Sequence, residues 1–184
     1  MTERIETPRL ILRKARESDL DAIWHNVWED GSLAEYTCWT PFTATREEAE
    51  DRLRRTIAFQ AQVPMYFICL RDTDEAIGFV GAHEEEPGEY YGIGLCVAAA
   101  HQRKGYGAEA YLALMKEFFF RGSAERWIYS CFRENQPSAM LCASLGFTFL
   151  RSSERVRERD GRPYICDEYL MMREQFLARY GANA

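Results

Sequence analysis

The chain of 184 residues carries a formal net charge of −6, and 47% of its residues are hydrophobic. This length predicts one domain over residues 1–184 that folds without disulfides, so we expect its six cysteines to be reduced and not bound to a metal. The acidic balance disfavours a general nucleic-acid-binding protein, so we expect no nucleic-acid partner. The sequence has no long apolar run and no apolar signal segment, so we expect a cytoplasmic protein with no membrane partner.

Apolar periodicity and turn residues divide the chain into short elements. Strands are predicted at residues 7–13, 65–70, 76–84, 90–97, 127–132, 147–156 and 163–172. Helices are predicted to follow Ser18, Thr45, Gly105 and Asn135. Because the strand at 127–132 follows a strand and a helix, we expect it to lie parallel to the strand at 90–97.

Four aromatic residues cluster near the first two predicted helices, namely Trp24, Trp28, Trp39 and Phe42. They either line a substrate groove or pack in the core. For each residue taken singly, ordinary packing is the more frequent outcome.

The most informative stretch is a strand, a glycine loop and a helix in the middle of the chain. An apolar strand at 93–97 leads into a loop at 102–107, and an amphipathic helix follows. Gly105 and Gly107 allow the backbone to approach a phosphate closely, while Arg103 and Lys104 add positive charge. The first N–H groups of the helix would point at the bound anion. We interpret the loop as a pyrophosphate-binding site.

Three interpretations of this loop compete. It is an ordinary strand-to-helix turn, a dinucleotide-binding turn or an acyl-CoA-binding loop. The pattern Gly105-x-Gly107-x-x-Ala110 fits the dinucleotide fingerprint, but that fingerprint normally follows the first strand of a parallel unit. The absence of a GxxxxGK[ST] pattern excludes a P-loop.

Several motifs together resemble the GNAT superfamily of N-acetyltransferases. They are Gln102-x-x-Gly105-x-Gly107 after a strand that ends at Val97, Asn135-x-x-Ser138, and Leu145-Gly146-Phe147. The N-terminal run T-P-R-L-I-L-R followed by S-D-L is similar to the RimJ/RimL-like branch of ribosomal-protein N-acetyltransferases. The resemblance covers roughly residues 5–173 and implies one GNAT domain of the α+β class. Its sheet is expected to be mixed and mostly antiparallel, with about seven strands and about four helices.

The resemblance implies acetyl-CoA as the cosubstrate and assigns residues to it. The implied binding residues are Leu95, Cys96, Val97, Gln102, Arg103, Lys104, Gly105, Tyr106, Gly107, Ala108 and Asn135. The strand residues would offer backbone groups to the pantetheine arm, and the loop would hold the pyrophosphate. Asn135 also fits a helix N-cap, and both roles can hold together.

The catalytic residues are less clearly marked. Many GNAT members carry a tyrosine where this chain has Cys142, so we prefer Ser138 as the proton donor to the departing thiolate. Glu84 is the preferred general base, because the family often places a carboxylate at this strand end. The alternative carboxylates are Glu85, Glu86, Glu89, Asp167 and Glu168.

The motifs predict an N-acetyltransferase that acts on a primary amine of a protein N-terminus or a small molecule, by direct attack in a ternary complex. The alternative is a non-catalytic acyl-CoA-binding or sensor module, and a nucleotide-dependent oxidoreductase is a weaker third. The acidic cluster at residues 84–86 favours a cationic acceptor, either a basic N-terminal segment or a polyamine-like molecule. The sequence allows a homodimer but does not require one.

Overall fold

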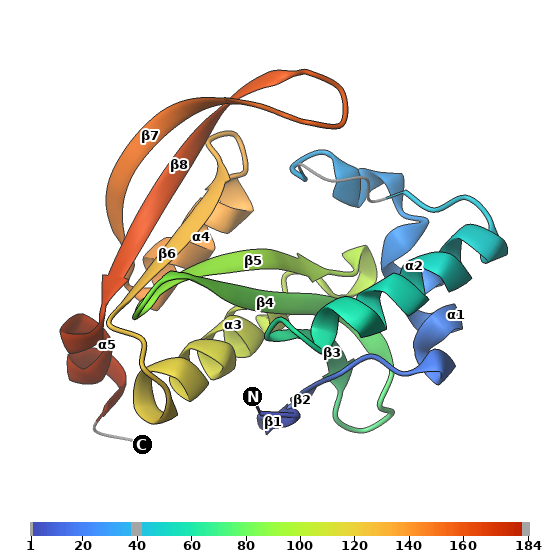
Figure 1. The fold of residues 1–184 in the computed structure, drawn as a ribbon, viewed down its shortest axis with the longest axis horizontal. Coiled ribbons are helices and arrows are strands. Elements are labelled where there is room, and N and C mark those ends of the chain that lie inside the picture. Colours follow the sequence, from blue (N-terminus) through green and yellow to red (C-terminus); the bar gives the residue numbers. More distant parts are fainter. Residues whose placement is uncertain (1, 38–41, 182–184) are drawn as a thin grey trace. The chain divides into compact units, whose positions relative to one another are not determined.

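The structure is a computed structural model that describes residues 2–37 and 42–181, so the predicted groove residue Trp39 lies outside the described residues. In chain order the strands and helices are β1 (Arg4–Glu6), β2 (Leu10–Arg13), α1 (Leu20–Ile23), α2 (Arg46–Gln60), β3 (Met65–Leu70), β4 (Ala76–Glu86), β5 (Glu89–Val97), α3 (Tyr106–Lys116), β6 (Arg126–Phe132), α4 (Gln136–Leu145), β7 (Thr148–Val156), β8 (Pro163–Met172) and α5 (Arg173–Tyr180) (Figure 1).

Eight strands follow the hydrogen-bonded order β1-β2-β3-β4-β5-β6-β8-β7. As predicted, β5 and β6 pair in parallel, over residues 89–91 of β5. The other strand pairs that the structure describes are antiparallel, so the sheet is mixed and mostly antiparallel. The predicted α+β class is therefore confirmed. The predicted count was too low by one strand and one helix. The strand β1 has only three residues, and α5 begins directly after β8 with no turn residue to mark the change.

The described residues form two compact units. The first comprises residues 2–37, 42–82 and 93–114, and the second comprises residues 83–92 and 115–181. In the first, Leu10 and Leu12 of β2 are both 0% exposed. In the second, the buried Trp127 packs near Phe119, whose ring stacks on Phe176 of α5 with centroids 4.5 Å apart.

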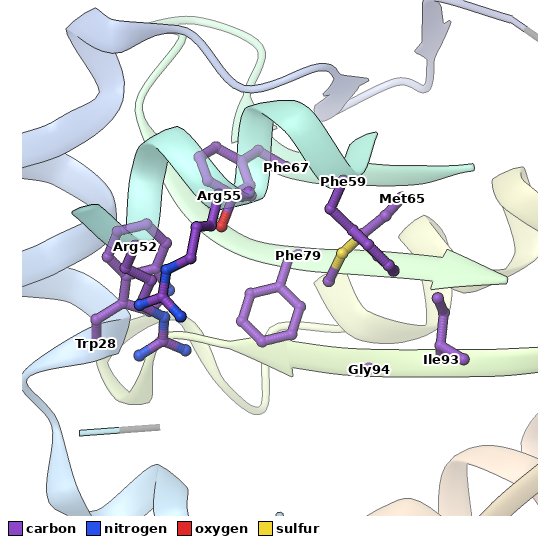
Figure 2. Close-up of a pocket in the computed structure, with 10 residues that line it drawn as sticks. Trp28, Arg52, Arg55, Phe59, Met65, Phe67, Phe79, Ile93 and Gly94 are labelled. Carbon is purple, nitrogen blue, oxygen red and sulfur yellow. The ribbon is translucent and has the colours of Figure 1, made fainter. Parts of the chain in front are cut away.

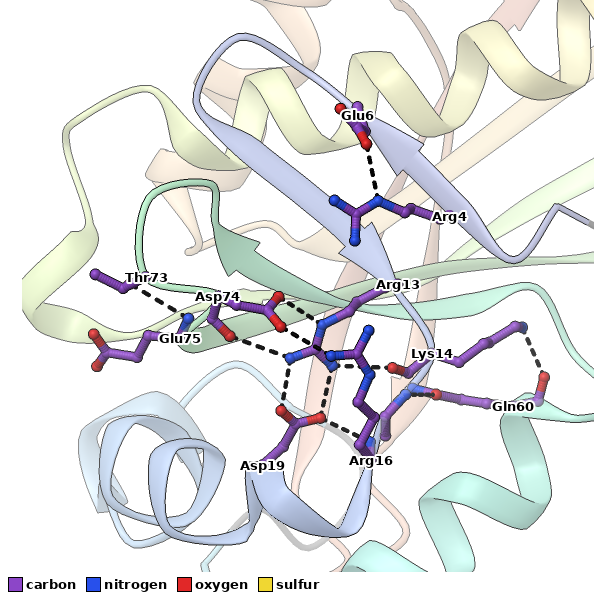
Figure 3. A network of polar contacts seen from close by, with 11 residues as sticks. Arg4, Glu6, Arg13, Lys14, Arg16, Asp19, Gln60, Thr73, Asp74 and Glu75 are labelled. Atoms are coloured by element: carbon purple, nitrogen blue, oxygen red, sulfur yellow. Dashed lines mark hydrogen bonds and ion pairs between the residues drawn. The ribbon is translucent and has the colours of Figure 1, made fainter.

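Arg13 of β2 is the centre of a buried polar cluster in the first unit (Figure 3). Its guanidinium donates to both carboxylate oxygens of Asp19, at 2.8 and 2.7 Å, and to Asp74 at 2.8 Å. Hydrogen bonds from Arg13 hold the pKa of Asp74 below its ordinary value. Asp19 also accepts from the Arg16 N–H at 2.7 Å. The predicted cap at Ser18 was therefore wrong, because the first helical turn begins after Arg16 and Asp19 closes it.

The other predicted capping box, at the start of α2, is confirmed. The Thr45 hydroxyl accepts from the Glu48 N–H at 3.3 Å, and the Glu48 carboxylate accepts from the Thr45 N–H at 3.2 Å. These two bonds satisfy backbone donors that the first turn of a helix leaves unpaired. Among the described residues, none of the helices has the length and apolar character needed to cross a membrane.

Candidate functional site

The end of β5 leads into the predicted phosphate loop, within the first unit. Leu95, Cys96 and Val97 are half-buried. A Cβ on Gly78 of β4 would lie 2.1 Å from the carbonyl oxygen of Cys96, which is far inside van der Waals contact. Only a glycine at this position of β4 lets β5 pass so closely. The backbone that the family resemblance assigns to pantetheine is thus positioned by β4.

The loop after β5 contains two residues with left-handed backbone. The φ angle is +63° at Arg103 and +82° at Gly105. The Gln102 side-chain amide donates to the Val97 carbonyl at 3.0 Å and closes the turn. The helix α3 begins at Tyr106, and the first N–H groups of a helix have no partner within it. The remaining predicted loop residues are the exposed Lys104, and Gly107 and Ala108 in the first turn of α3. This arrangement can bind an anion such as a pyrophosphate.

The N-terminal segment holds this loop through contacts that the sequence did not predict. The Glu109 carboxylate of α3 accepts from the Thr7 hydroxyl at 2.7 Å, and from the backbone N–H and Nε of Arg9 at 3.0 and 2.7 Å. Arg9 also donates to the Lys104 carbonyl at 2.9 Å, and its guanidinium lies 4.7 Å from the centroid of the Tyr106 ring. Burial alone would raise the pKa of Glu109, but the hydrogen bonds from Thr7 and Arg9 outweigh it and lower that pKa.

Two predicted residues, Asn135 and Ser138, lie together at the start of α4 in the second unit. The Asn135 side chain accepts from the Ser138 N–H at 3.2 Å, so its predicted role as an N-cap is confirmed. The Ser138 hydroxyl is hydrogen-bonded to the Tyr129 hydroxyl of β6 at 2.6 Å. Tyr129 is 8% exposed, and burial raises the pKa of its hydroxyl. No sequence pattern marks Tyr129 as a functional residue, because a tyrosine in a buried strand is most simply a core residue.

The cysteine at the position of the usual tyrosine is a core residue in the structure. Cys142 is 0% exposed, and burial raises the pKa of its thiol. The nearby Cys131 is 8% exposed, and burial raises the pKa of its thiol to about 11. A thiol with a raised pKa donates its proton less readily, which favours packing over acid catalysis at Cys142.

Five of the six acidic candidates have a hydrogen bond or an ion pair that the structure describes. Glu84, at the exposed end of β4, accepts from the Gly88 N–H at 2.8 Å, and Glu85 pairs with His83 at 3.0 Å. Hydrogen bonds from Arg133 hold the pKa of Asp167 below its ordinary value, which is the wrong direction for a general base. The other carboxylates also have cationic partners, namely Glu89 with Arg126, and Glu168 with Arg151 and Arg155. The role of Glu84 as a base stays a prediction.

One predicted aromatic residue lines a cavity in the first unit (Figure 2). Trp28 is 2% exposed and borders a space of about 420 Å³ between α2 and the strands β3, β4 and β5. Trp24 instead donates its indole N–H to the Thr43 carbonyl at 3.0 Å, and Phe42 is 52% exposed. Of the three predicted groove residues that the structure describes, Trp28 is the one that lines this cavity.

Comparison with known proteins gives a family and several similar structures. The sequence pattern of a family described as acetyltransferase (GNAT) domain matches residues 9–148. The uncharacterized N-acetyltransferase YnaD of Bacillus subtilis (strain 168) is 28% identical over 142 residues, which is 77% of this chain and 81% of that protein. RimL, a ribosomal alpha-N-protein acetyltransferase solved in complex with coenzyme A, gives a TM-score of 0.79 at 23% identity, covering 94% of this chain and 99% of RimL. MccE, a microcin C7 self-immunity acetyltransferase solved with acetyl-CoA and AMP, gives a TM-score of 0.79 at 16% identity, and the match covers 90% of this chain and 93% of MccE.

Proposed function

The chain belongs to the acetyltransferase (GNAT) family, as its motifs predicted, and from this premise we propose the reaction that it catalyses. It is an acyltransferase with acetyl-CoA as its cosubstrate. The proposed reaction transfers the acetyl group to a primary amine of a protein N-terminus or a small molecule. The amine attacks directly while both substrates are bound. The predicted RimJ/RimL-like branch has a counterpart in the similar structure of RimL.

The loop at residues 102–107 is the observation that carries this proposal. Its left-handed residues Arg103 and Gly105 turn the chain sharply into the start of α3, where helix N–H groups and positive side chains can hold a pyrophosphate. Arg9 holds the loop through the Lys104 carbonyl, and Thr7 and Arg9 hold the first turn of α3 through Glu109. The half-buried backbone of β5 directly before the loop is suited to an extended pantetheine arm.

The thioester of acetyl-CoA supplies an activated acetyl group, so the protein must position the amine, remove its proton and protonate the leaving thiolate. In the proposal, Glu84 accepts the proton from the ammonium, either directly or through water. The neutral amine nitrogen then forms its bond to the acetyl carbon as the carbon–sulfur bond breaks, and the nitrogen gives up its second proton, which replaces the one that Ser138 passes to the thiolate. Ser138 donates a proton to the thiolate, and the bond from Tyr129 fixes the direction of the Ser138 hydroxyl. Asn135 keeps its cap and offers its remaining amide group to pantetheine.

The acceptor arrives as a cation, because an aliphatic amine is protonated in neutral solution. The exposed carboxylates at residues 84–86 support attraction of such a cation. Exposed charges are screened beyond about 8 Å at physiological salt, so the acceptor KM should rise as salt is added. The five thiols that the structure describes as free support a cytoplasmic place of action.

The alternative is a module that binds acyl-CoA without turnover. The cysteine in place of the family tyrosine favours it, since Cys142 is buried and a poor proton donor. Release of free CoA from acetyl-CoA, measured across a panel of amines, separates the two. Amine-dependent release supports the enzyme, and tight binding without release for any amine supports the module.

A thermal-shift measurement with Gly105→Glu tests the loop. Acetyl-CoA should stabilise the wild-type protein against heat by mass action, and the substitution should abolish this shift. A carboxylate at this left-handed position strains the backbone and repels the pyrophosphate. An unchanged thermal shift in the variant would place the phosphates elsewhere.

A further inference from the structure

The cavity beneath α2 has the size and lining of a small-molecule site. Its volume of about 420 Å³ falls within the roughly 300–1,000 Å³ that such sites occupy. Most of its wall is apolar, and Phe67 and Phe79 form its floor with exposures of 1% and 3%. Phe59 of α2 is 45% exposed, so the wall reaches the molecular surface at that helix.

The two ends of the cavity differ in charge (Figure 2). The guanidinium groups of Arg52 and Arg55 lie at the end occupied by Trp28. Phe59 and Met65 lie at the opposite end, which is apolar. A ligand that fits this lining has an apolar body and one anionic group, because an arginine fork binds a carboxylate through two parallel hydrogen bonds.

Arg52 is held in position before any ligand binds. Its guanidinium lies 4.6 Å from the centroid of the Trp28 ring, and it donates to the Thr43 hydroxyl at 3.0 Å. Burial lowers the pKa of Arg52 to about 10, against a raising effect of the nearby Cys96 thiol, and the like charge of Arg55 lowers it further. An anion at this end would stabilise the guanidinium charge that burial disfavours.

The two arginines that line this end differ in burial. Arg55 is exposed and lies 2.8 Å from Asp51, which is also 3.7 Å from Arg54. Arg52 is half-buried, and Trp28 and Thr43 fix the direction of its guanidinium. Arg52 is therefore the main anchor for an anion, and Arg55 contributes a partly neutralised second charge.

The cavity also lies directly beside the backbone that the proposed function assigns to the cosubstrate. Ile93 and Gly94 of β5 line it, and Leu95 is the next residue along the strand. Gly94 has a φ of +57°, and a Cβ there would lie 3.0 Å from the Phe79 ring. A side chain at this position would both strain the strand and fill the cavity.

We propose that this cavity binds the acceptor of the acetyl group, and that the acceptor is an amine of the amino-acid type with an apolar or aromatic side chain and a carboxylate. The carboxylate pairs with Arg52 and Arg55, and the side chain lies among the aromatic residues. This inference rests on the proposed acetyl transfer. It narrows the acceptor to an amine that carries a carboxylate beside its ammonium group, because a polyamine has no group for the apolar wall or for the arginines.

An acceptor panel tests the two recognition elements separately. Phenylalanine should be acetylated with a higher kcat/KM than phenethylamine, which lacks the carboxylate, by on the order of 30-fold. It should exceed alanine, which lacks the aromatic ring, by at least about tenfold. Arg52→Met should remove the preference, so that the ratio of the kcat/KM values for phenylalanine and phenethylamine falls to about one. The matched control Arg54→Gln, a 70% exposed arginine of the same helix that does not line the cavity, should behave as wild type.

A binding measurement separates this inference from the proposed function. Phenylpropionate has the ring and the carboxylate but no amine, so it should bind and quench tryptophan fluorescence without any reaction. Arg52→Met should weaken this binding at least tenfold, and Arg55→Gln, at a 73% exposed position where folding is not at risk, should weaken it less. If phenylpropionate binding depended on Arg52 but no amine were acetylated, the proposed acetyl transfer would be overturned and the ligand site would stand. The proposed site would be overturned if wild type and Arg52→Met acetylated spermidine with equal kcat/KM. It would also be overturned if phenylpropionate bound with the same Kd to wild type, Arg52→Met and Arg55→Gln.

Discussion

Glu109 connects the N-terminal segment to the phosphate loop, and Glu109→Gln removes that connection while keeping the shape of the side chain. The carboxylate accepts three hydrogen bonds from Thr7 and Arg9. Buried bonds to a charged group contribute about 1.5–3 kcal/mol each. The Arg9 side chain is 48% exposed, so its ion pair with Glu109 contributes only about 0–1 kcal/mol to the free energy of unfolding. The glutamine keeps part of the bonding to Thr7, so we expect a loss of about 1–3 kcal/mol in the free energy of unfolding.

Thermal melting and CoA titration measure the consequences. The melting temperature should fall by about 2–4 °C for each kcal/mol lost. The Kd for CoA should rise roughly three- to tenfold, because Arg9 no longer holds the Lys104 carbonyl and the loop must be ordered on binding. The control Glu50→Gln removes only an exposed pair with Arg46 and should change neither value. A variant that melts and binds CoA as wild type would refute the proposed support of the loop.

The pH dependence gives a second readout of the same carboxylate. The pKa of Glu109 in the folded protein lies below its ordinary value of 4.5. The ionised carboxylate therefore contributes its full stabilisation of the fold at pH values above 4.5. It is lost as the pH falls through the lower folded-state pKa. The difference in stability between wild type and Glu109→Gln should therefore shrink in acid. A constant difference from neutral pH down to pH values near 2 would contradict this cause.

Four further substitutions, with one control, test the rest of the candidate site. Gly78→Ala should lower the free energy of unfolding, measured by urea denaturation, by about 1–3 kcal/mol, because the new Cβ would lie 2.1 Å from the Cys96 carbonyl oxygen. A Cβ at Gly31 would meet nothing within 4 Å, so the control Gly31→Ala should not carry this cost. Asn135→Ala should cost about 1 kcal/mol of stability and also weaken CoA binding; an unchanged CoA affinity would leave Asn135 only its cap. Ser138→Ala should lower kcat more than it raises the KM for acetyl-CoA, while Cys142→Ala should act mainly on stability, and the reverse pattern would assign the acid to Cys142.

The features that the sequence predicted well are local in the chain. The turn at residues 102–107 depends on Gln102, Gly105 and Gly107, which lie within six residues of one another, and glycine spacing reports backbone conformation directly. The cap at Asn135 and the box at Thr45 are likewise set by residues three apart. Such patterns need no knowledge of how distant segments pack.

The features that the sequence did not predict depend on contacts between distant segments. Arg9 and Glu109 are 100 residues apart, and nothing near either residue marks the other as its partner. Arg52 looks like a solvated helix charge until the structure places it against Trp28 and lowers its pKa through burial. The helix start expected at Ser18 moved to Arg16 because Arg13 fixes the Asp19 carboxylate from a neighbouring strand. Tertiary packing decided each of these outcomes.

The central claim is that an amine takes the acetyl group directly from acetyl-CoA on this protein. A single-turnover experiment with acetyl-CoA labelled in its acetyl group tests it most directly. With phenylalanine or a panel of other amines present, the label should appear as an acid-stable amide on the amine, at the same rate as free CoA is released. Without an amine, the protein should bind labelled acetyl-CoA and retain no covalent label. Binding with no labelled amide from any amine would contradict the claim and leave a protein that binds acyl-CoA without turning it over.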